Sequence, residues 1–506
     1  MTNDPKRRPR GSAWAAVFLA GALIGGLSTV QIVPNFTGAA VDPVTGEVLD
    51  VADGTVTTDL STTDGGATGK AGGDGDAAAT SGGGGSGPST TASDGGLPPA
   101  RAGLECAAGK NGDETDQGVT GDTIKMATTV AESGPGASFL GQVRFAMEAV
   151  RARINRDGGI CGRQLEIEYR DDGWNPQTGS QYLRNFIQEG VFAIPVAPSS
   201  EGLRIVIDSG DIDKAGIPVV GTDGMLKDQY TNAAGAAQPF VWPVAAATVS
   251  SARIMVEEAY KRGARDFSIV FEKNYRFGVE AAQAFNEHVK KLTGKPVAGY
   301  NGQNSCVDHY CGINGGGSNY SSEAANFNRG DFVALFMEPT TALNWMRDPN
   351  VDPSKQVPFG YGAAQPLFTR GFANSCGSKC HGMQVWTGFR PPIENYANDP
   401  AVKRYVEDLK RTKPDADEFN AFTEGGYVGM LLLEDALKRV GPDLTRVRLK
   451  AALDSTCLDT GLLIKGKLCY GPSSRYSNIY MQGFQIQYSG TFAGWRSGPI
   501  VKDPSF

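Results

Sequence analysis

The sequence has few histidines and none of the common catalytic motifs. Only three of its 506 residues are His, and it contains no Gly-x-Ser-x-Gly, no His-Glu-x-x-His and no Walker phosphate loop. His288 lies in the polar pattern of an expected helix, where solvation is its expected role. The formal net charge of −7 argues against nucleic-acid binding, which usually needs a basic face. We therefore expect no enzyme, no cofactor and no nucleic-acid partner.

Charge is absent from residues 11–41, which follow a basic start. The stretch Trp14–Val33 is mostly apolar, and about 20 such residues suffice to cross a bilayer. The basic residues before it are Lys6, Arg7, Arg8 and Arg10. Because positive flanks stay inside the cell, we expect a cytoplasmic tail at 1–12, a single transmembrane anchor at 13–34 and an extracellular folded domain at the cell membrane.

No Cys precedes Cys106, so a lipid attached just after the apolar stretch is excluded. A cleaved signal peptide is the alternative to a retained anchor, with Thr37-Gly38-Ala39-Ala40 as its cleavage site. A mature protein that begins near residue 40 would support the cleaved signal.

Aromatic residues are absent from the next segment, apart from Phe36 at its edge. Residues 35–100 are rich in Gly, Ser and Thr and include the run Gly82–Gly85. Such a composition cannot bury enough surface to offset chain entropy, so a disordered linker is expected. As a flexible coil it would span roughly 40–50 Å, enough to lift the domain at 101–506 off a membrane.

All eight cysteines lie in the folded part, which in an exported protein favours disulfides. Three pairs are close in sequence, and the simplest pairing is 106–161, 306–311, 376–380 and 457–469. The residues are Cys106, Cys161, Cys306, Cys311, Cys376, Cys380, Cys457 and Cys469. Zinc binding is the alternative, because two clusters contain both thiols and imidazoles. They are Cys306-His309-Cys311 and Cys376-Cys380-His381, and the second only loosely resembles a haem attachment motif.

The folded part alternates strand and helix patterns, which predicts parallel sheets covered by helices. In its first half, strands are expected at 123–128, 164–169, 191–196 and 217–220, with helices from 143, 176 and 200. After Pro243 the alternation restarts, with strands expected at 267–271, 296–300, 332–337 and 357–361 and helices at 279–292 and 422–440. An α/β protein of two Rossmann-like lobes is therefore expected. Its loops at the carboxyl ends of the strands are the place where such sheets bind ligands.

Several motifs then stand in a specific order. They are Ser133-Gly134-Pro135, Ile154-Asn155-Arg156-Asp157-Gly158-Gly159, Gly162-Arg163, Asp171-Asp172-Gly173-Trp174-Asn175-Pro176, Pro198-Ser199-Ser200, Ile217-Pro218-Val219-Val220 and Gly425-Gly426-Tyr427. Over residues 120–500 this succession resembles the type I periplasmic solute-binding proteins of ABC importers, in the branched-chain amino-acid and amide-binding branch. The resemblance implies two lobes joined by three crossings near Trp242, near Trp386-Thr387 and near Tyr470.

The implied lobe boundaries are approximate. Lobe 1 would comprise about 120–242 and 387–470, and lobe 2 about 243–386 and 471–500.

The resemblance also implies site residues in the first lobe. Ser133 and Gly134 match the loop after the first strand, and Ser199 and Ser200 match a serine that binds a ligand carboxylate. A hydroxyl and amides at a helix start suit an anion, although a plain helix cap is the alternative role. Thr222 and Asp223 match ligand contacts after a later strand, while Gly224 stands near the position of a family threonine.

In the second lobe, Tyr275 and Phe277 match an aromatic wall of the site, with packing as the alternative. The acid that usually holds a ligand amino group is missing from Phe359–Ala364, and Glu338 is the expected substitute. Asp171, Asp172 and Trp174 are expected to be turn and capping residues, above all the two acids, with a place at the rim of the cleft as the alternative.

The implied function is a membrane-tethered receptor that captures a small polar solute, such as an amino acid or an amide, and delivers it to an ABC-transporter permease. The alternative is an extracellular ligand sensor that signals through a separate partner.

Overall fold

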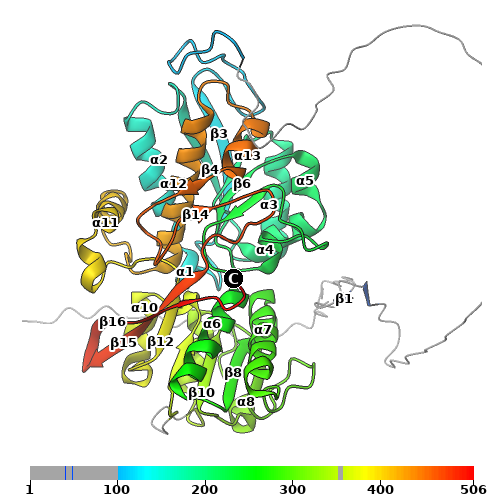
Figure 1. Cartoon of the computed structure of the whole chain (residues 1–506), viewed down its shortest axis with the longest axis vertical. Helices are drawn as coiled ribbons and strands as arrows, with labels where there is room; N and C mark the ends of the chain where they lie inside the picture. The colour runs from blue at the N-terminus through cyan, green and yellow to red at the C-terminus, as the bar shows by residue number, and fades with distance from the viewer. Residues whose placement is uncertain (1–39, 42–47, 50–100, 352–356) are drawn as a thin grey trace, which may run out of the picture. The chain divides into compact units, whose positions relative to one another are not determined.

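The computed structural model describes residues 40–41, 48–49, 101–351 and 357–506 (Figure 1). It divides into two units, Met1–Gly84 and Gly85–Phe506. In the first unit, β1 (Ala40–Val41) pairs antiparallel with β2 (Val48–Leu49). The expected tail and anchor lie outside the described residues, as does the expected linker apart from these two strands. No helix in the described part is long and apolar enough to cross a membrane.

The first lobe of the second unit contains five parallel strands. β3 (Thr123–Val130) pairs with β4 (Gln164–Asp171), and β6 (Val219–Thr222) lies between β5 (Ile194–Pro195) and β7 (Val241–Pro243). A backbone hydrogen bond of 2.8 Å from Phe192 N to Lys125 O joins the two groups of strands. Helices pack on both sides, as Figure 1 shows. They are α1 (Ala137–Leu140), α2 (Val143–Arg156), α3 (Pro176–Gln188), α4 (Ser200–Asp208), α5 (Asp211–Ala215), α11 (Pro400–Thr412), α12 (Ala421–Val440) and α13 (Arg446–Asp454).

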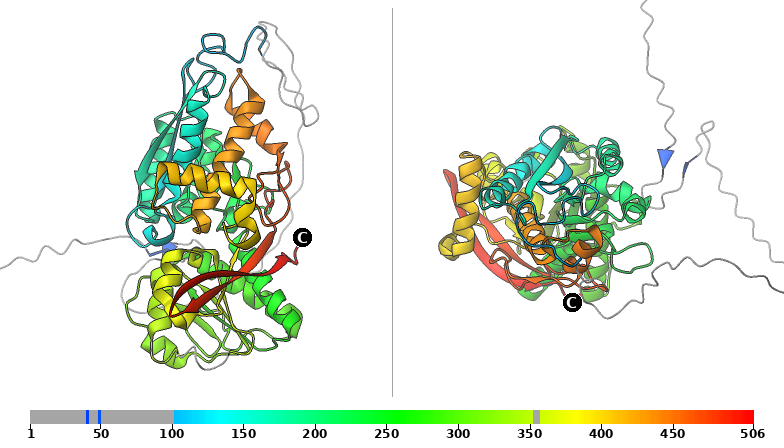
Figure 2. Two further views of the ribbon diagram at one scale, coloured as in Figure 1. Left: turned by 90° about the vertical axis from the view of Figure 1, so that its left-hand side faces the viewer. Right: turned by 90° about the horizontal axis from the view of Figure 1, so that it is seen from above.

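The second lobe contains a seven-stranded sheet in the order β16-β15-β12-β11-β10-β8-β9. Its strands are β8 (Phe267–Glu272), β9 (Tyr310–Ile313), β10 (Phe332–Phe336), β11 (Tyr361–Ala363), β12 (Gln384–Thr387), β15 (Tyr480–Ser489) and β16 (Thr491–Lys502). The first five are parallel, and the hairpin β15–β16 adds antiparallel strands at one edge (red in Figure 2). Its helices are α6 (Thr248–Arg262), α7 (Arg276–Thr293), α8 (Ser321–Asn326), α9 (Pro339–Arg347) and α10 (Arg370–Cys376).

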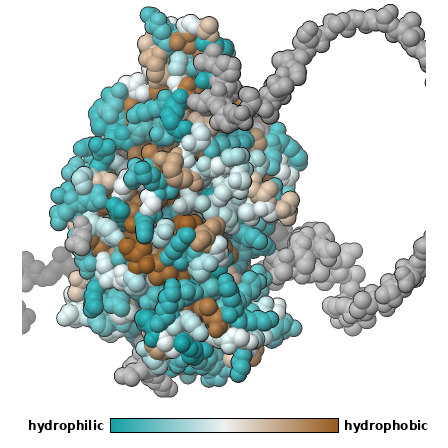
Figure 3. Space-filling model, in the orientation of Figure 1, coloured by the Kyte–Doolittle hydropathy of each residue, from teal (hydrophilic) through white to brown (hydrophobic). Residues whose placement is uncertain are grey.

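Short elements complete the fold. They are the 3-10 turns η1 (Lys227–Gln229), η2 (Gln365–Leu367), η3 (Gly377–Cys380) and η4 (Glu394–Asn398), and the paired strands β13 (Cys457–Leu458) and β14 (Leu468–Cys469). The surface shown in Figure 3 is mostly hydrophilic, because the large apolar side chains are buried between the sheets and helices.

Local sequence chemistry sets the helix starts that matter for the site. Asn175 caps α3 by accepting hydrogen bonds from Gln177 N and Thr178 N, with Pro176 as the first helical residue. Asn420 caps α12 in the same way, and its side chain also donates to Phe139 O at 2.9 Å. The α12 start is thereby fixed against α1, the short helix that follows β3.

Helix α12 lies unusually close to strand β6. Gly221 has a φ of +83°, and a Cβ atom there would come within 2.4 Å of Gly429 Cα. Any side chain at either glycine would push the helix away from the sheet. The close approach brings the first turn of α12 beside the loop that follows β6.

The chain passes between the two lobes three times, after β7, after β12 and before β15. Asn478 joins all three passages, because its side-chain nitrogen donates to Val244 O at 3.2 Å and to Gly388 O at 3.4 Å. Tyr470 adds a 2.7 Å hydrogen bond to Pro243 O. The lobe boundaries predicted from sequence stay a proposal.

Most expected elements occur within a few residues of their predicted bounds, and two strands were wrong. Residues 296–300 form a turn rather than a strand, since Tyr300 N donates to Val297 O. The strand expected at 357–361 begins at Tyr361, because Gly360 N closes a turn on Val357 O. The apolar run at 191–196 contributes only Ile194–Pro195 to a strand.

The eight cysteines form four disulfides, in the pairs that the sequence analysis named. They are Cys106–Cys161, Cys306–Cys311, Cys376–Cys380 and Cys457–Cys469. The described residues contain no cluster of three or more His, Cys, Asp or Glu side chains that could hold a metal ion.

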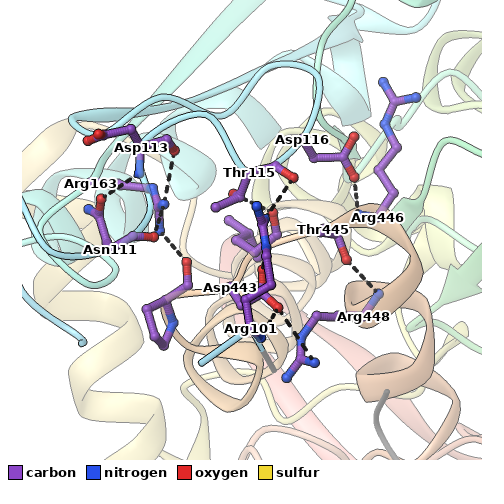
Figure 4. Close-up of polar contacts among 12 residues, drawn as sticks. Arg101, Asn111, Asp113, Thr115, Asp116, Arg163, Asp443, Thr445, Arg446 and Arg448 are labelled. Carbon is purple, nitrogen blue, oxygen red and sulfur yellow. Dashed lines mark hydrogen bonds and ion pairs between the residues drawn. The ribbon is translucent and has the colours of Figure 1, made fainter. Parts of the chain in front are cut away.

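The segment 101–121 is fastened to the first lobe by ion pairs and hydrogen bonds (Figure 4) and by the first disulfide. Arg101 Nε contacts Asp443 Oδ1 at 2.7 Å, and Arg446 N donates to Asp116 Oδ2 at 2.6 Å. The guanidinium of Arg163, which is fully buried, donates to four main-chain oxygens. These belong to Asn111, Asp113, Thr120 and Pro442. We call this segment the N-terminal clasp.

Candidate functional site

The carboxyl ends of the parallel strands of both lobes meet around two small cavities. The space between the protein atoms there, counting the solvent at the mouth of each cavity, is about 310 Å³ in the first and about 230 Å³ in the second. Both are lined by Asp223 and Phe422 of the first lobe and by Gln365 of the second lobe. The two cavities therefore form one divided site, which we call the cleft cavity.

Among the described residues that line the cleft cavity, Asp223 is the only charged one. It follows β6 and is 6% exposed. Its Oδ1 accepts hydrogen bonds from Met225 N at 3.2 Å and from Gln229 Nε2 at 3.0 Å, whereas Oδ2 has no partner among the described residues apart from the neighbouring hydroxyl of Ser200. Burial raises the pKa of Asp223 to about 7, and the negative charge of Glu201 acts in the same direction.

The second lobe adds a few uncharged polar groups to the first cavity. Ser251, on the first turn of α6, is 4% exposed, and its hydroxyl has no partner in the described part of the chain. Gln365 follows β11, and its side-chain oxygen accepts a hydrogen bond of 3.4 Å from Thr387 Oγ1. Thr248 lines the same cavity. The polar groups of both lobes thus converge on a common space.

The remaining walls are apolar or glycine. In the first cavity they are Met225, Ala246, Phe277, Ala364, Pro366, Phe422 and Met481. In the second cavity they are Val143, Val196, Pro198, Gly221, Ala245, Phe389, Phe422, Gly425 and Gly426. A ligand here would bury mostly hydrocarbon, which is favourable by about 25 cal/mol per Å² of apolar area.

The two lobes also contact each other directly beside the cleft cavity. Arg276 N, at the start of α7, donates to Glu201 Oε1 of the first lobe at 2.7 Å. Trp174 stacks on Tyr275, with ring centroids 4.4 Å apart. A third contact runs from Lys227 N to Glu280 Oε2 at 2.9 Å. Ligand-enclosing closure of two lobes requires contacts of this kind.

Two of the nine expected ligand contacts, Asp223 and Phe277, line the cleft cavity. Ser133 and Gly134 lie in an exposed loop after β3, where Ser133 N donates to Asp171 Oδ1 at 3.3 Å. Gly134 packs against the main chain of Gly173 so closely that a Cβ would lie 2.2 Å from its oxygen. This loop borders the cleft at the side of Trp174.

Ser199 and Ser200 are buried at the start of α4 and each faces a carboxylate. Ser199 Oγ donates to Asp172 Oδ1 at 2.8 Å. Ser200 contacts the sulfur of Met225 at 3.9 Å and lies close enough to Asp223 to favour its charged form. Burial raises the pKa of Asp172 to about 6. A ligand carboxylate at these serines would therefore meet two buried acids.

The other expected contacts serve the protein itself in this conformation. The hydroxyl of Thr222 donates to the side-chain oxygen of Gln229. Tyr275 is the stacking partner of Trp174 and directly precedes α7. Glu338 caps α9, where its oxygens accept from Thr340 N at 2.6 Å and from Thr341 N. Its role as a ligand contact stays a prediction.

Glu338 has a second buried acid beside it. Glu272, at the end of β8, accepts from Glu338 N at 3.2 Å, and its Oε1 has no hydrogen-bond partner among the described residues. Burial, followed by the negative charge of Glu338, raises the pKa of Glu272 to about 8. The parallel pairing of β8 with β10 places these two acids at neighbouring strand ends.

Sequence reasoning missed most of the cavity lining, including Gln365, Phe422 and Ser251. Gln365 and Phe422 each follow a recognisable signal, since one comes directly after a strand and the other begins a helix after a capping Asn. Ser251 lies inside a helix and carried no signal.

Comparison with known proteins identifies the family. Residues 123–475 match the model of a family described as periplasmic binding protein. The chain belongs to the periplasmic binding protein family. A search of the curated proteins found no match. Members of this family and the structural neighbours below are substrate-binding proteins rather than enzymes.

Solved structures of periplasmic binding proteins share the type I fold of this chain. A fatty acid ABC transporter substrate-binding protein from Thermomonospora curvata has a TM-score of 0.62 and 18% identity, over 78% of this chain and 96% of that chain. A solute-binding protein from R. palustris in complex with benzoate has a TM-score of 0.59 and 17% identity, over 76% and 98%. A leucine binding protein from Thermotoga maritima has a TM-score of 0.59 and 15% identity, over 76% and 100%.

Proposed function

We propose that this periplasmic binding protein captures a small solute in the cleft cavity and delivers it to the permease of an ABC importer. The observation that carries the proposal is the lining of the cavity, because Asp223 and Phe422 come from one lobe and Gln365 from the other. A molecule bound there touches both lobes. Such contacts stabilise a closed form relative to an open one.

The comparisons support transport as the purpose of capture. The neighbours from Thermomonospora curvata and R. palustris are both named as substrate-binding proteins of ABC transporters. The four disulfides support an oxidising compartment outside the cytoplasm. We further propose that the apolar stretch at 13–34 holds the protein in the cell membrane with this domain outside.

Capture is tested by isolating the solute and by following closure. We expect a small molecule to be released when the full chain, purified in mild detergent, is denatured and its filtrate is analysed by mass spectrometry. Adding that molecule back to stripped protein should change the fluorescence of Trp174, because its ring stacks on Tyr275 only when the lobes are together.

The matched control is Trp174→Phe, which keeps an aromatic ring and removes one of the six indoles of the chain, so the part of the fluorescence change that comes from Trp174 should disappear. Binding that leaves the Trp174 signal unchanged would contradict capture by closure. Chemical turnover of the released molecule by the purified protein would contradict a receptor.

A further inference from the structure

We infer that the solute of the cleft cavity is a small, mainly apolar molecule with a hydrogen-bond-donating head, either an amine or a hydroxyl, and without a carboxylate. The inference rests on the proposed function and names the chemical class of its ligand. It departs from the carboxylate ligand that the sequence motif at Ser199 and Ser200 predicts.

The charges at the cavity oppose an anionic ligand. Asp223 lines both parts of the cavity, and the described part of the chain adds no Lys, Arg or His to either lining. A ligand carboxylate would leave water for a space that already holds one buried acid and offers no cation. Burying a charge without an opposite charge is strongly unfavourable.

The helix starts around the cleft, which are the usual anion sites of such folds, already hold groups of the protein. Glu201 occupies the start of α7, and Glu338 occupies the start of α9. Asn420 accepts the first free amides of α12. The start of α4 lies beside Asp172 and Asp223. At α6, the amide of the first residue donates to Met225 O at 3.1 Å. These starts therefore give a ligand anion little to bind.

The cavity contains buried polar atoms that a hydrogen-bond donor on the ligand could satisfy. Ser251 Oγ is buried without a partner among the described residues, and so is Asp223 Oδ2 apart from the neighbouring hydroxyl of Ser200. An ionised carboxylate can accept hydrogen bonds but cannot donate them, whereas a hydroxyl can do both. One amine or hydroxyl of a ligand can satisfy Asp223, while the Met and Phe walls receive its hydrocarbon part.

The two kinds of head differ in their dependence on pH. The groups that face Asp223 are the side chains of Ser200 and Gln229, the amide of Met225 and the more distant carboxylate of Glu201. The phenol of Tyr230 also lies near Asp223, and burial raises the pKa of Tyr230 well above its usual value, so it stays neutral over this range. With its pKa near 7, Asp223 is largely protonated below neutrality. Binding of an ammonium head should strengthen as the pH rises from 6 to 8, because the ionised acid attracts it. Binding of a hydroxyl head should change little over this range.

The test uses matched probes that differ only in their head group. Benzylamine, benzyl alcohol and benzoate form one set, and isoamylamine, isoamyl alcohol and 4-methylpentanoate form another. Calorimetry on the full chain in mild detergent, stripped of bound solute, measures each affinity at pH 6 and pH 8. We expect the amine or the alcohol of at least one set to bind at least about tenfold more tightly than its acid.

The variant Asp223→Asn should weaken the amine at least about tenfold at pH 8, since the charge pair is lost. The surface variant Asp157→Asn is the matched control and should leave all affinities unchanged. Tighter binding of the acid in both sets would overturn the inference, and so would the absence of binding by every probe.

A cavity-filling variant separates this inference from the proposed function. Ala246→Phe places a ring in the first cavity, and the smaller change Ala364→Val serves if that variant does not fold. If an acid binds the wild type and no longer binds the filled variant, the solute is captured in the cleft as proposed, and only the inferred ligand class is overturned. Binding of any probe that survives filling would contradict both.

Discussion

The buried acid of the cleft should make the ligand-free protein lose stability as the pH rises. The pKa of Asp223 is about 7 in the folded protein against an ordinary value of 3.8. Below pH 4 the carboxyl is protonated in both the folded and the unfolded states. Between pH 4 and pH 7 the unfolded chain releases this proton while the folded protein retains it, so the free energy of unfolding falls. Above pH 7 the loss is complete.

The size of this loss follows from the pKa difference. Each unit corresponds to about 1.4 kcal/mol, so a difference of about three units gives at most about 4 kcal/mol. The figure is an upper limit, because opening of the lobes hydrates the carboxylate without unfolding the protein. For a domain of about 400 residues, 4 kcal/mol corresponds to about 5 °C in melting temperature.

The substitution Asp223→Asn removes the titration while keeping an oxygen for Met225 N and Gln229 Nε2. We therefore expect the melting temperature of the variant, relative to the wild type, to rise between pH 4 and pH 8 by up to about 5 °C. Scanning calorimetry of the ligand-free proteins measures this difference. Other buried acids, such as Asp172 and Glu272, titrate in both proteins, so their contributions cancel in the difference between the two melting temperatures.

Asp157→Asn on the surface is the control and should show no such dependence. A difference between Asp223→Asn and the wild type that is constant with pH, or that falls as the pH rises, would refute the assignment of a buried, proton-holding acid to the cleft.

Three further predictions concern the hinge, the lobe contact and the disulfides. Asn478→Ala removes the side chain that links the three passages between lobes. The variant should lower the free energy of unfolding by about 1–3 kcal/mol and speed hydrogen exchange at the hinge. Unchanged exchange would contradict this role of Asn478. Trp174→Ala should weaken solute binding measured by calorimetry by about threefold to tenfold, because a stacked pair contributes about 0.5–1.5 kcal/mol beyond its buried area; equal affinity would contradict a role in closure. Cys161→Ser opens a loop of 55 residues and Cys380→Ser opens one of 4. Chain entropy therefore predicts that the free energy of unfolding, measured by denaturant titration, falls by about 4 kcal/mol in the first variant and about 2 kcal/mol in the second. A larger fall in Cys380→Ser would contradict the chain-entropy explanation.

Much of the fold could be predicted because hydrophobic periodicity marks its elements directly. The helix expected from Val143 is α2, and the strand expected from Thr123 is β3. The strand expected at 296–300 was wrong because Tyr300 N closes a turn on Val297 O, and periodicity in a short run does not distinguish a turn from a strand.

The candidate site was less predictable because its residues are brought together by packing. Asp223 was named since it directly follows a strand end, where α/β sheets bind ligands. Phe422 enters the cavity because Gly221 and Gly429 let α12 approach β6, and this close approach is a property of two distant segments. Ser199 had the local chemistry of an anion site, but Asp172, 27 residues earlier, takes its hydroxyl.

The N-terminal clasp attaches the start of the folded domain to the first lobe and not to the second. Strands β3 and β4 of the first lobe point their carboxyl ends at the cleft, whereas the clasp is bonded near their amino ends and near the carboxyl end of α12. A pull on the chain at Arg101 therefore enters the pole of the first lobe that is farthest from the hinge. The disulfide and the buried Arg163 join this segment to the sheet of the first lobe, and neither contact involves the hinge residue Asn478. In the proposed tethered receptor, the second lobe can therefore rotate about the hinge without moving the point at Arg101 where the chain enters the folded domain.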